Sequence, residues 1–130
     1  MESQSSYRGF KELNSWKEAR ELRRQVSEHC KHFPDHEKFQ LISQIQRASR
    51  SVTANIAEGY GRFTYTDTRR FFIQARGSVA EVLDHITLAQ DEGYMNEEVS
   101  LALEGKCETV FRLINGYIAY LDKAQQQKVK

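Results

Sequence analysis

The stretch QIQRASRSVTANIAEGYGR, residues 44–62, has the composition of a helix that packs closely against another helix. Most of its side chains near the core are small, and Val52 and Ile56 supply a narrow apolar seam. Small side chains let a neighbouring helix approach toward the short end of the usual interaxial distance of about 8–10 Å. Residues 75–78 form a second cluster of small residues with charges beside them. We therefore expect residues 44–62 to lie against this later segment.

Two polar residues lie beside the apolar seam, Asn55 and Glu58. A polar group near a core needs a hydrogen-bond partner. We expect both to make structural contacts with the later segment, where Arg76 and Glu81 accompany the small residues. Arg76 is the expected partner of Glu58, because a planar guanidinium can bind a carboxylate in two places. The spacing also permits a second arrangement, in which Glu58 pairs with Arg62 along an exposed helix face.

Length and composition predict one domain that spans residues 1–130 and is large enough to bury a core. The polar leader, residues 1–9, and the tail, residues 125–130, are expected to be mobile. No apolar run approaches the ~20 residues that span a bilayer, and the N-terminus lacks the apolar centre of a signal peptide. Cys30 and Cys107 have no metal-binding or redox spacing. We expect a cytoplasmic protein with two free thiols.

Apolar residues recur at helical spacing in four segments. The predicted helices span residues 10–32, 36–59 and 66–92, and a fourth helix follows residue 96. Asp35, Thr66 and Asn96 are the expected N-caps, and Gly93 is the expected C-cap of the third helix. Short connections favour antiparallel neighbours. The predicted fold class is therefore all-α, an antiparallel up-down-up-down four-helix bundle.

Two positions in these helices carry specific expectations. Phe39 falls on the apolar stripe of the second helix, so we expect it in the core. Gly77 lies in the middle of the third helix, where glycine costs roughly 1 kcal/mol relative to alanine. Close contact with another helix is the simplest compensation.

The predicted topology separates charge between the two ends of the bundle. Residues 1–11, 60–70 and 122–130 meet at one end, where eight basic residues face three acidic ones. Residues 28–38 and 90–98 meet at the other end, where two basic residues face seven acidic ones. We expect an electric dipole with one basic pole.

The basic pole combines cations with aromatic rings. Its candidate nucleic-acid-binding residues are Arg62, Arg69, Arg70, Lys123 and Lys128, with Tyr60, Phe63 and Tyr65 among them. Phosphates bind cations, and unpaired bases stack on aromatic faces. The alternative is that these rings only attach the loop to the bundle.

The sequence offers little for catalysis. Di-iron bundles use paired Glu-x-x-His motifs, but Glu81 and His85 are four residues apart and no second pair follows. His29, His32 and His36 gather at the acidic end, where solvated histidines and a metal site are both open. No nucleophile motif or glycine-rich phosphate loop is present. We expect no catalytic residues, no cofactor and no metal.

Three segments together resemble a known family. SVTANIAEGYGR at residues 51–62, FFIQARGSVAE at residues 71–81 and EGYM at residues 92–95 are similar to the bacterial 23S ribosomal RNA intervening-sequence proteins, and the similarity spans nearly the whole chain. This resemblance implies a four-helix protomer in a ring-shaped homo-oligomer, commonly a pentamer. Relatives of that family include accessory proteins of diversity-generating retroelements, which bind a reverse transcriptase and nucleic acid. The resemblance implies no catalytic residues.

The expected function is that of a non-enzymatic, homo-oligomeric RNA-binding accessory protein, associated either with rRNA or with a reverse transcriptase. The expected partners are further copies of the chain, RNA or another nucleic acid, and a reverse transcriptase; a membrane is not among them. An alternative is a structural oligomer or protein adaptor without nucleic-acid affinity. A ribonuclease is the least supported, because no acid–base pair is present.

Overall fold

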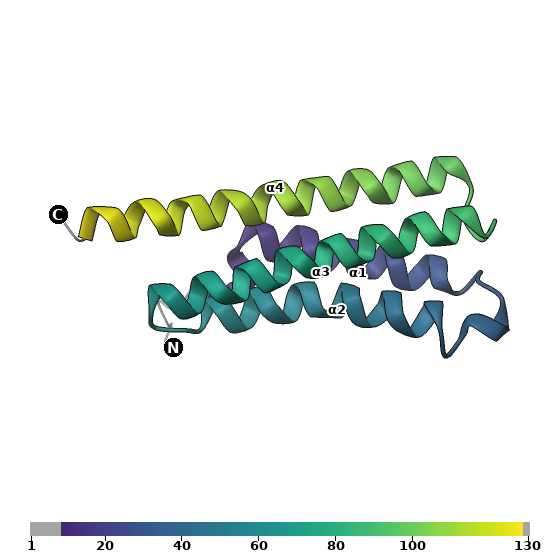
Figure 1. Cartoon of the computed structure of the whole chain (residues 1–130), viewed down its shortest axis with the longest axis horizontal. Coiled ribbons are helices and arrows are strands. Elements are labelled where there is room, and N and C mark those ends of the chain that lie inside the picture. The colour runs from purple at the N-terminus through teal and green to yellow at the C-terminus, as the bar shows by residue number, and fades with distance from the viewer. Residues whose placement is uncertain (1–8, 129–130) are drawn as a thin grey trace, which may run out of the picture.

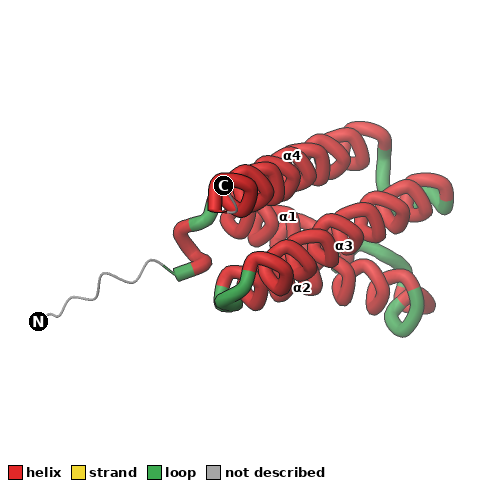
Figure 2. Tube along the Cα trace, turned by 60° about the vertical axis from the view of Figure 1, so that its left-hand side comes forward, coloured by secondary structure: helices red, strands yellow, loops and turns green. Residues whose placement is uncertain are grey.

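Four α-helices pack side by side as an antiparallel bundle in the computed structural model, which describes residues 9–128 (Figure 1). Helix α1 spans Asn14–Cys30, α2 Leu41–Tyr60, α3 Tyr65–Asp91 and α4 Glu97–Lys128, and the short 3₁₀ helices η1 (Phe10–Glu12) and η2 (Asp35–Glu37) precede α1 and α2. Each helix contacts two neighbours, and α2 and α3 share the most extensive contact. Figure 2 shows that all the regular structure of the described chain is helical. The predicted all-α class with four helices is confirmed.

One core runs along the bundle axis and takes an apolar stripe from every helix. Its largest fully buried side chains include Leu22, Ile45, Ile56, Phe72, Val79, Ile86, Leu103 and Ile114. Burying a side chain of this size contributes about 1.5–3 kcal/mol relative to leaving it exposed. Over residues 9–128, none of the helices combines the length and apolar character that crossing a bilayer requires.

Gly59 lets the end of α2 approach α3 closely. A Cβ at this position would lie 2.8 Å from Cβ of Phe71 and 3.1 Å from Cδ1 of Phe72. Gly77 differs, because a Cβ there would meet nothing within 4 Å. The expected compensation of Gly77 by a close helix contact is therefore wrong within this chain.

The first turns of α3 and α4 correct one expected cap and confirm another. Thr64, rather than Thr66, caps α3: its hydroxyl accepts a hydrogen bond from the backbone N–H of Asp67 at 3.2 Å. Asn96 is confirmed as the cap of α4, since its Oδ1 accepts from the N–H of Val99 at 2.8 Å. Side chains that bind backbone N–H groups in this way satisfy donors that have no partner within the helix.

The end of α3 follows the prediction. Gly93 has a positive φ of 81° and lies just after the helix. Its N–H donates to the carbonyl of Gln90 at 3.0 Å, and the N–H of Tyr94 donates to the carbonyl of Ala89 at 2.9 Å. These two bonds form a Schellman motif, which favours glycine at the left-handed position.

The start of α2 differs from the prediction. Asp35 begins η2 rather than α2, and the helix starts only at Leu41, whose N–H donates to Glu37 Oε1 at 3.2 Å. Phe33 and Leu41 are 6% and 2% exposed and fill this end of the core. Phe39 lies in the break between η2 and α2, so its ring is 86% exposed and the expected core position is wrong.

Helix α4 continues to Lys128 and extends past the α2–α3 turn (Figure 1). Residues 125–128 are therefore helical, and their expected mobility stays a prediction. Residues 129–130, and residues 1–8 of the expected mobile leader, lie outside the described residues.

Candidate nucleic-acid interface

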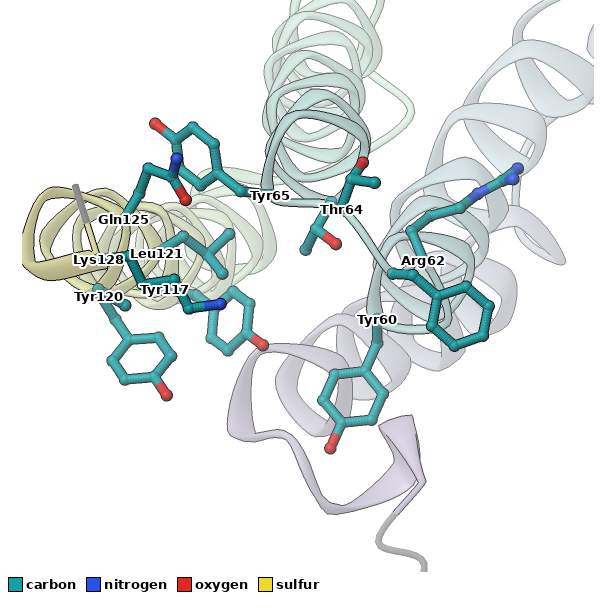
Figure 3. Close-up of a pocket in the computed structure, with 12 residues that line it drawn as sticks. Tyr60, Arg62, Thr64, Tyr65, Tyr117, Tyr120, Leu121, Gln125 and Lys128 are labelled. Carbon is teal, nitrogen blue, oxygen red and sulfur yellow. The ribbon is translucent and has the colours of Figure 1, made fainter.

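An open pocket of about 280 Å³ lies where the α2–α3 turn faces the C-terminal half of α4 (Figure 3). We call it the aromatic pocket. Its lining residues are Tyr60, Arg62, Phe63, Thr64, Tyr65, Thr68, Tyr117, Tyr120, Leu121, Ala124, Gln125 and Lys128. Five of these twelve side chains are aromatic and two are cations, whereas none is acidic. The surface therefore combines stacking faces with positive charge.

A series of rings runs from the core to the edge of this pocket. The ring of Tyr117 stacks on the buried ring of Phe72, with centroids 4.5 Å apart and planes 24° apart. Tyr120 follows one turn later, with its centroid 5.6 Å from that of Tyr117, and is 63% exposed. Burial, together with the nearby phenols of Tyr60 and Tyr120, raises the pKa of Tyr117. The aromatic wall of the pocket is thus anchored in the core through Tyr117.

Two cations are held against one buried ring beside the pocket. The guanidinium carbons of Arg62 and Arg70 lie 4.8 Å and 4.6 Å from the ring centroid of Phe71. Arg62 pairs with Glu58 at 2.7 Å and Arg70 with Asp67 at 3.6 Å. Both side chains are about half exposed, at 41% and 53%. The two guanidinium groups are therefore fixed in position and open to solvent.

Asp122 joins the start of α3 to the end of α4. Its carboxylate accepts hydrogen bonds from Arg69 Nε at 2.8 Å and from the Tyr65 hydroxyl at 2.7 Å. The bonds from Arg69 and then Tyr65 lower the pKa of Asp122, while the bond to Asp122 raises the pKa of both Tyr65 and Arg69. These contacts hold the overhanging part of α4 beside the α2–α3 turn.

The structure brings together five of the eight predicted nucleic-acid-binding residues. Tyr60, Arg62, Phe63, Tyr65 and Lys128 all line the aromatic pocket. Phe63 is fully exposed.

The other three predicted residues lie nearby and outside the pocket. Arg69 and Arg70 line an adjoining shallow groove on α3. Lys123 is exposed on α4. Arg62, Arg69 and Arg70 each pair with a carboxylate; Asp67 and Asp122 were already among the counted acids, whereas Glu58 adds one more.

Sequence reasoning missed the contribution of α4 to this site. Tyr117, Tyr120, Leu121 and Ala124 form one wall, and Asp122 positions it. The signal was present as an i, i+3, i+4, i+7 pattern that continues beyond the last core residues.

The predicted Glu58–Arg76 pair is wrong. Glu58 instead pairs with Arg62 one turn along α2, the second arrangement that the spacing allowed. Arg76 donates from Nη1 to Asn115 Oδ1 on α4 at 2.8 Å. The Glu58–Arg62 contact within α2 and the Arg76–Asn115 contact between α3 and α4 are both solvent-exposed, so neither is a buried contact between α2 and α3.

Asn55 also stays on its own helix. Its Nδ2 donates to the carbonyl and the hydroxyl oxygens of Ser51, at 2.9 Å and 3.0 Å. The expected contact to α3 is made by Ser51, whose hydroxyl lies 2.9 Å from that of Ser78. Glu81, the remaining member of the predicted polar set, lies 3.3 Å from His85 Nε2 on α3.

Of the three histidines predicted to gather at the acidic end of the bundle, His36 contacts a tyrosine. Nε2 of His36 lies 3.3 Å from the hydroxyl of Tyr94, and its ring packs edge-on to the ring of Tyr94. Among residues 9–128, no three His, Cys, Asp or Glu side chains come together as a metal-binding group.

Comparisons with known proteins agree on the fold. The sequence model of the 23S rRNA-intervening sequence protein family matches residues 11–116. A crystal structure from Bacteroides thetaiotaomicron, of a protein with unknown function from the S23 ribosomal protein family, superposes with a TM-score of 0.74 at 19% identity. The alignment covers 80% of this chain and 97% of that one. No curated protein matches this chain.

Proposed function

The chain belongs to the 23S rRNA-intervening sequence protein family, and on this premise we propose that it is a non-enzymatic, homo-oligomeric protein that binds RNA. The binding surface is the end of the bundle that holds the aromatic pocket. The RNA is either ribosomal or part of a reverse-transcriptase system that the protein serves as an accessory.

The observation that carries this proposal is the environment of Phe63. Its ring is fully exposed and lies next in sequence to Arg62, whose guanidinium is held over Phe71. Exposed rings beside fixed cations are the combination that binds single-stranded nucleic acids, because bases stack on the rings while phosphates contact the cations.

The ion pairs at this end do not oppose binding strongly. The pairs of Arg62 with Glu58 and of Arg70 with Asp67 are half exposed. Exposed pairs contribute only about 0.2–1 kcal/mol. A phosphate can therefore replace the carboxylate at small cost, and exposed Lys123 and Lys128 add charge.

Binding of labelled RNA, measured by fluorescence anisotropy over a range of salt concentrations, tests this proposal. The wild-type affinity should fall steeply with salt because counterions are released from the RNA. The variant Arg62→Gln/Lys123→Gln/Lys128→Gln should bind more weakly and flatten the logarithmic salt slope by about 0.7 for each lost contact to single-stranded RNA. Arg69 is left unchanged because it holds α4 in place through Asp122.

A matched control removes the same charge elsewhere. Lys17→Gln/Arg24→Gln/Arg47→Gln changes three exposed cations on other faces of α1 and α2. This variant should keep most of the wild-type affinity. Equal losses in both triple variants, or no binding by the wild-type protein, would overturn the proposal.

The oligomeric part of the proposal predicts a ring, with five subunits as the expected number. In a ring the pockets of all subunits face one rim, and weak contacts then strengthen one another through effective concentration. Light scattering at micromolar concentration should give a mass several times that of one chain. A monomer at that concentration would contradict this part.

A second candidate function is supported by apolar surface away from the pocket. Phe39 is 86% exposed and Leu101 is 58% exposed. Phe39 lines a surface groove together with Ile42, and contiguous apolar surface of this kind fits contact with another protein chain, as in a structural oligomer or adaptor. This candidate predicts assembly or partner binding without RNA affinity, so the anisotropy measurement separates the two functions.

A further inference from the structure

We propose that the aromatic pocket accepts one unpaired nucleobase of a single-stranded nucleic acid. This inference rests on the proposed function and specifies which part of the RNA the site holds. The flanking phosphodiester then contacts Arg62 and Lys128, the two cations that line the pocket.

The walls suit a flat aromatic ligand. Tyr117 is fixed from behind by its stacking on the buried ring of Phe72. Tyr120 continues this ring series toward solvent, and Phe63 exposes its whole ring on the α2–α3 turn. Figure 3 shows Tyr117 on α4 across the opening from Tyr60 on α2, with Tyr120 on the far side of Tyr117. A ring held in place as Tyr117 is binds a base with little loss of side-chain entropy.

The size of the pocket limits the ligand. Pockets for drug-sized molecules usually measure about 300–1,000 Å³. At about 280 Å³ this one lies just below that range, which fits a single planar ring system. Thr64 and Gln125 lie at its edge (Figure 3). A hydroxyl and a carboxamide can both donate and accept hydrogen bonds along the edge of a base.

The charges of the pocket distinguish a base from another common ligand of aromatic cages. Rings arranged around a cavity also bind quaternary ammonium groups. A cationic ligand would meet Arg62 and Lys128, and no carboxylate is among the lining residues. A planar base that carries an anionic phosphodiester is complementary on both counts.

The test uses a single-stranded RNA with one 2-aminopurine, a fluorescent base whose emission falls when it stacks on an aromatic ring. The wild-type protein should quench this emission and bind the RNA. Tyr120→Leu and Phe63→Leu should each remove most of the quenching. Each should also weaken binding by about 5- to 150-fold, the range found for loss of one stacked base. Both side chains are exposed, so the variants should keep the wild-type helical circular dichroism signal.

Phe39→Leu is the control, because it changes another exposed aromatic ring, 86% exposed and outside the pocket. It should quench and bind like the wild type. If Tyr120→Leu and Phe63→Leu bind like the wild type while the Arg62/Lys123/Lys128 variant does not, the nucleobase pocket is refuted and the proposed function stands. If the wild-type protein binds no RNA, the proposed function fails and this inference fails with it.

Discussion

The two ends of the bundle use similar side chains in opposite ways. At the end formed by η2 and the α3–α4 connection, Tyr94 donates from its hydroxyl to Glu37 at 2.8 Å and packs its ring against Phe33 at 5.6 Å. Phe33 is only 6% exposed there, although Phe39, between η2 and α2 at the same end, is 86% exposed. At the opposite end, Phe63 is fully exposed and Tyr120 is 63% exposed around the aromatic pocket.

Phe33 and Tyr94 therefore stabilise the fold, whereas Phe63 and Tyr120 are exposed on the surface. A ring that packs on a neighbour and binds a carboxylate has its interactions satisfied within the chain. A ring that faces water beside fixed cations remains available to a partner. Counting charged and aromatic residues at each end cannot make that distinction, because both ends contain both classes. The contacts of each side chain do make it.

The largest expected loss of stability tests whether α2 and α3 are tightly packed at the end of the bundle that holds the aromatic pocket. Gly59→Ala should lower the free energy of unfolding by about 1–3 kcal/mol, because the added Cβ would lie 2.8 Å from Cβ of Phe71. Each kcal/mol should lower Tm by roughly 2–8 °C. Urea unfolding at fixed protein concentration measures the change.

Gly77→Ala is the control for this substitution. It adds the same methyl group where nothing lies within 4 Å, and it should stabilise the helix by up to about 1 kcal/mol. Equal destabilisation by both substitutions would show that the close approach of Phe71 is not the reason why residue 59 is a glycine.

A smaller loss of stability is expected from a change at the end formed by η2 and the α3–α4 connection, which we call the closed end. Tyr94→Phe removes the hydrogen bond to Glu37 and should lower Tm by less than Gly59→Ala does. The bond from Tyr94 is the main reason that the pKa of Glu37 is lowered from its usual 4.5. The same bond is the main reason that the pKa of Tyr94 is raised to about 12. The difference in Tm between Tyr94→Phe and the wild type should therefore be largest at pH values between the lowered pKa of Glu37 and 10, the usual pKa of a tyrosine. It should fade as pH drops through the lowered pKa of Glu37 and as pH rises from 10 toward 12.

Tyr120→Phe provides the comparison at the opposite end of the bundle, where the aromatic pocket lies. It deletes the same hydroxyl from a ring that is 63% exposed. Melting curves recorded from about pH 3 to 11 should be nearly unchanged for this variant relative to wild type. If Tyr94→Phe melts like Tyr120→Phe at neutral pH, the closed end is not held by this bond.

The fold was predictable from residues that obey local rules. The helical spacing of the core positions, the Asn96 cap and the left-handed Gly93 follow from side-chain chemistry within a few residues of chain. The errors come from competition that is visible only in three dimensions. Phe39 fits the helical pattern, but Phe33 and Leu41 already fill that end of the core.

The candidate site was predictable in part. Residues on the α2–α3 turn were found because they are adjacent in sequence, as Arg62, Phe63 and Tyr65 are. Tyr117 and Tyr120 come from a helix more than fifty residues later, and only the length of α4 places them opposite the turn. The charge count included Asp122, but it could not show that Asp122 pairs with Arg69 and so holds α4 beside the turn.

The smallest expected effect concerns Glu58, whose two possible partners differ in consequence. Had Glu58 formed a buried ion pair with Arg76, removing one of the two side chains would have cost about 3–5 kcal/mol. The structure instead pairs Glu58 with Arg62 on an exposed face, at 2.7 Å with side chains 55% and 41% exposed. Glu58→Ala should therefore cost only about 0.3–0.5 kcal/mol.

Double-mutant cycles identify the partner of Glu58. The effects of Glu58→Ala and Arg62→Ala should be less than additive, because both remove one interaction. Glu58→Ala and Arg76→Ala should be additive, since Arg76 binds Asn115 and shares no partner with Glu58. Because Arg62 is released from its carboxylate, Glu58→Ala should also strengthen RNA binding at low salt. A loss of several kcal/mol, or coupling to Arg76 rather than Arg62, would show that this end of the molecule is closed by an ion pair after all.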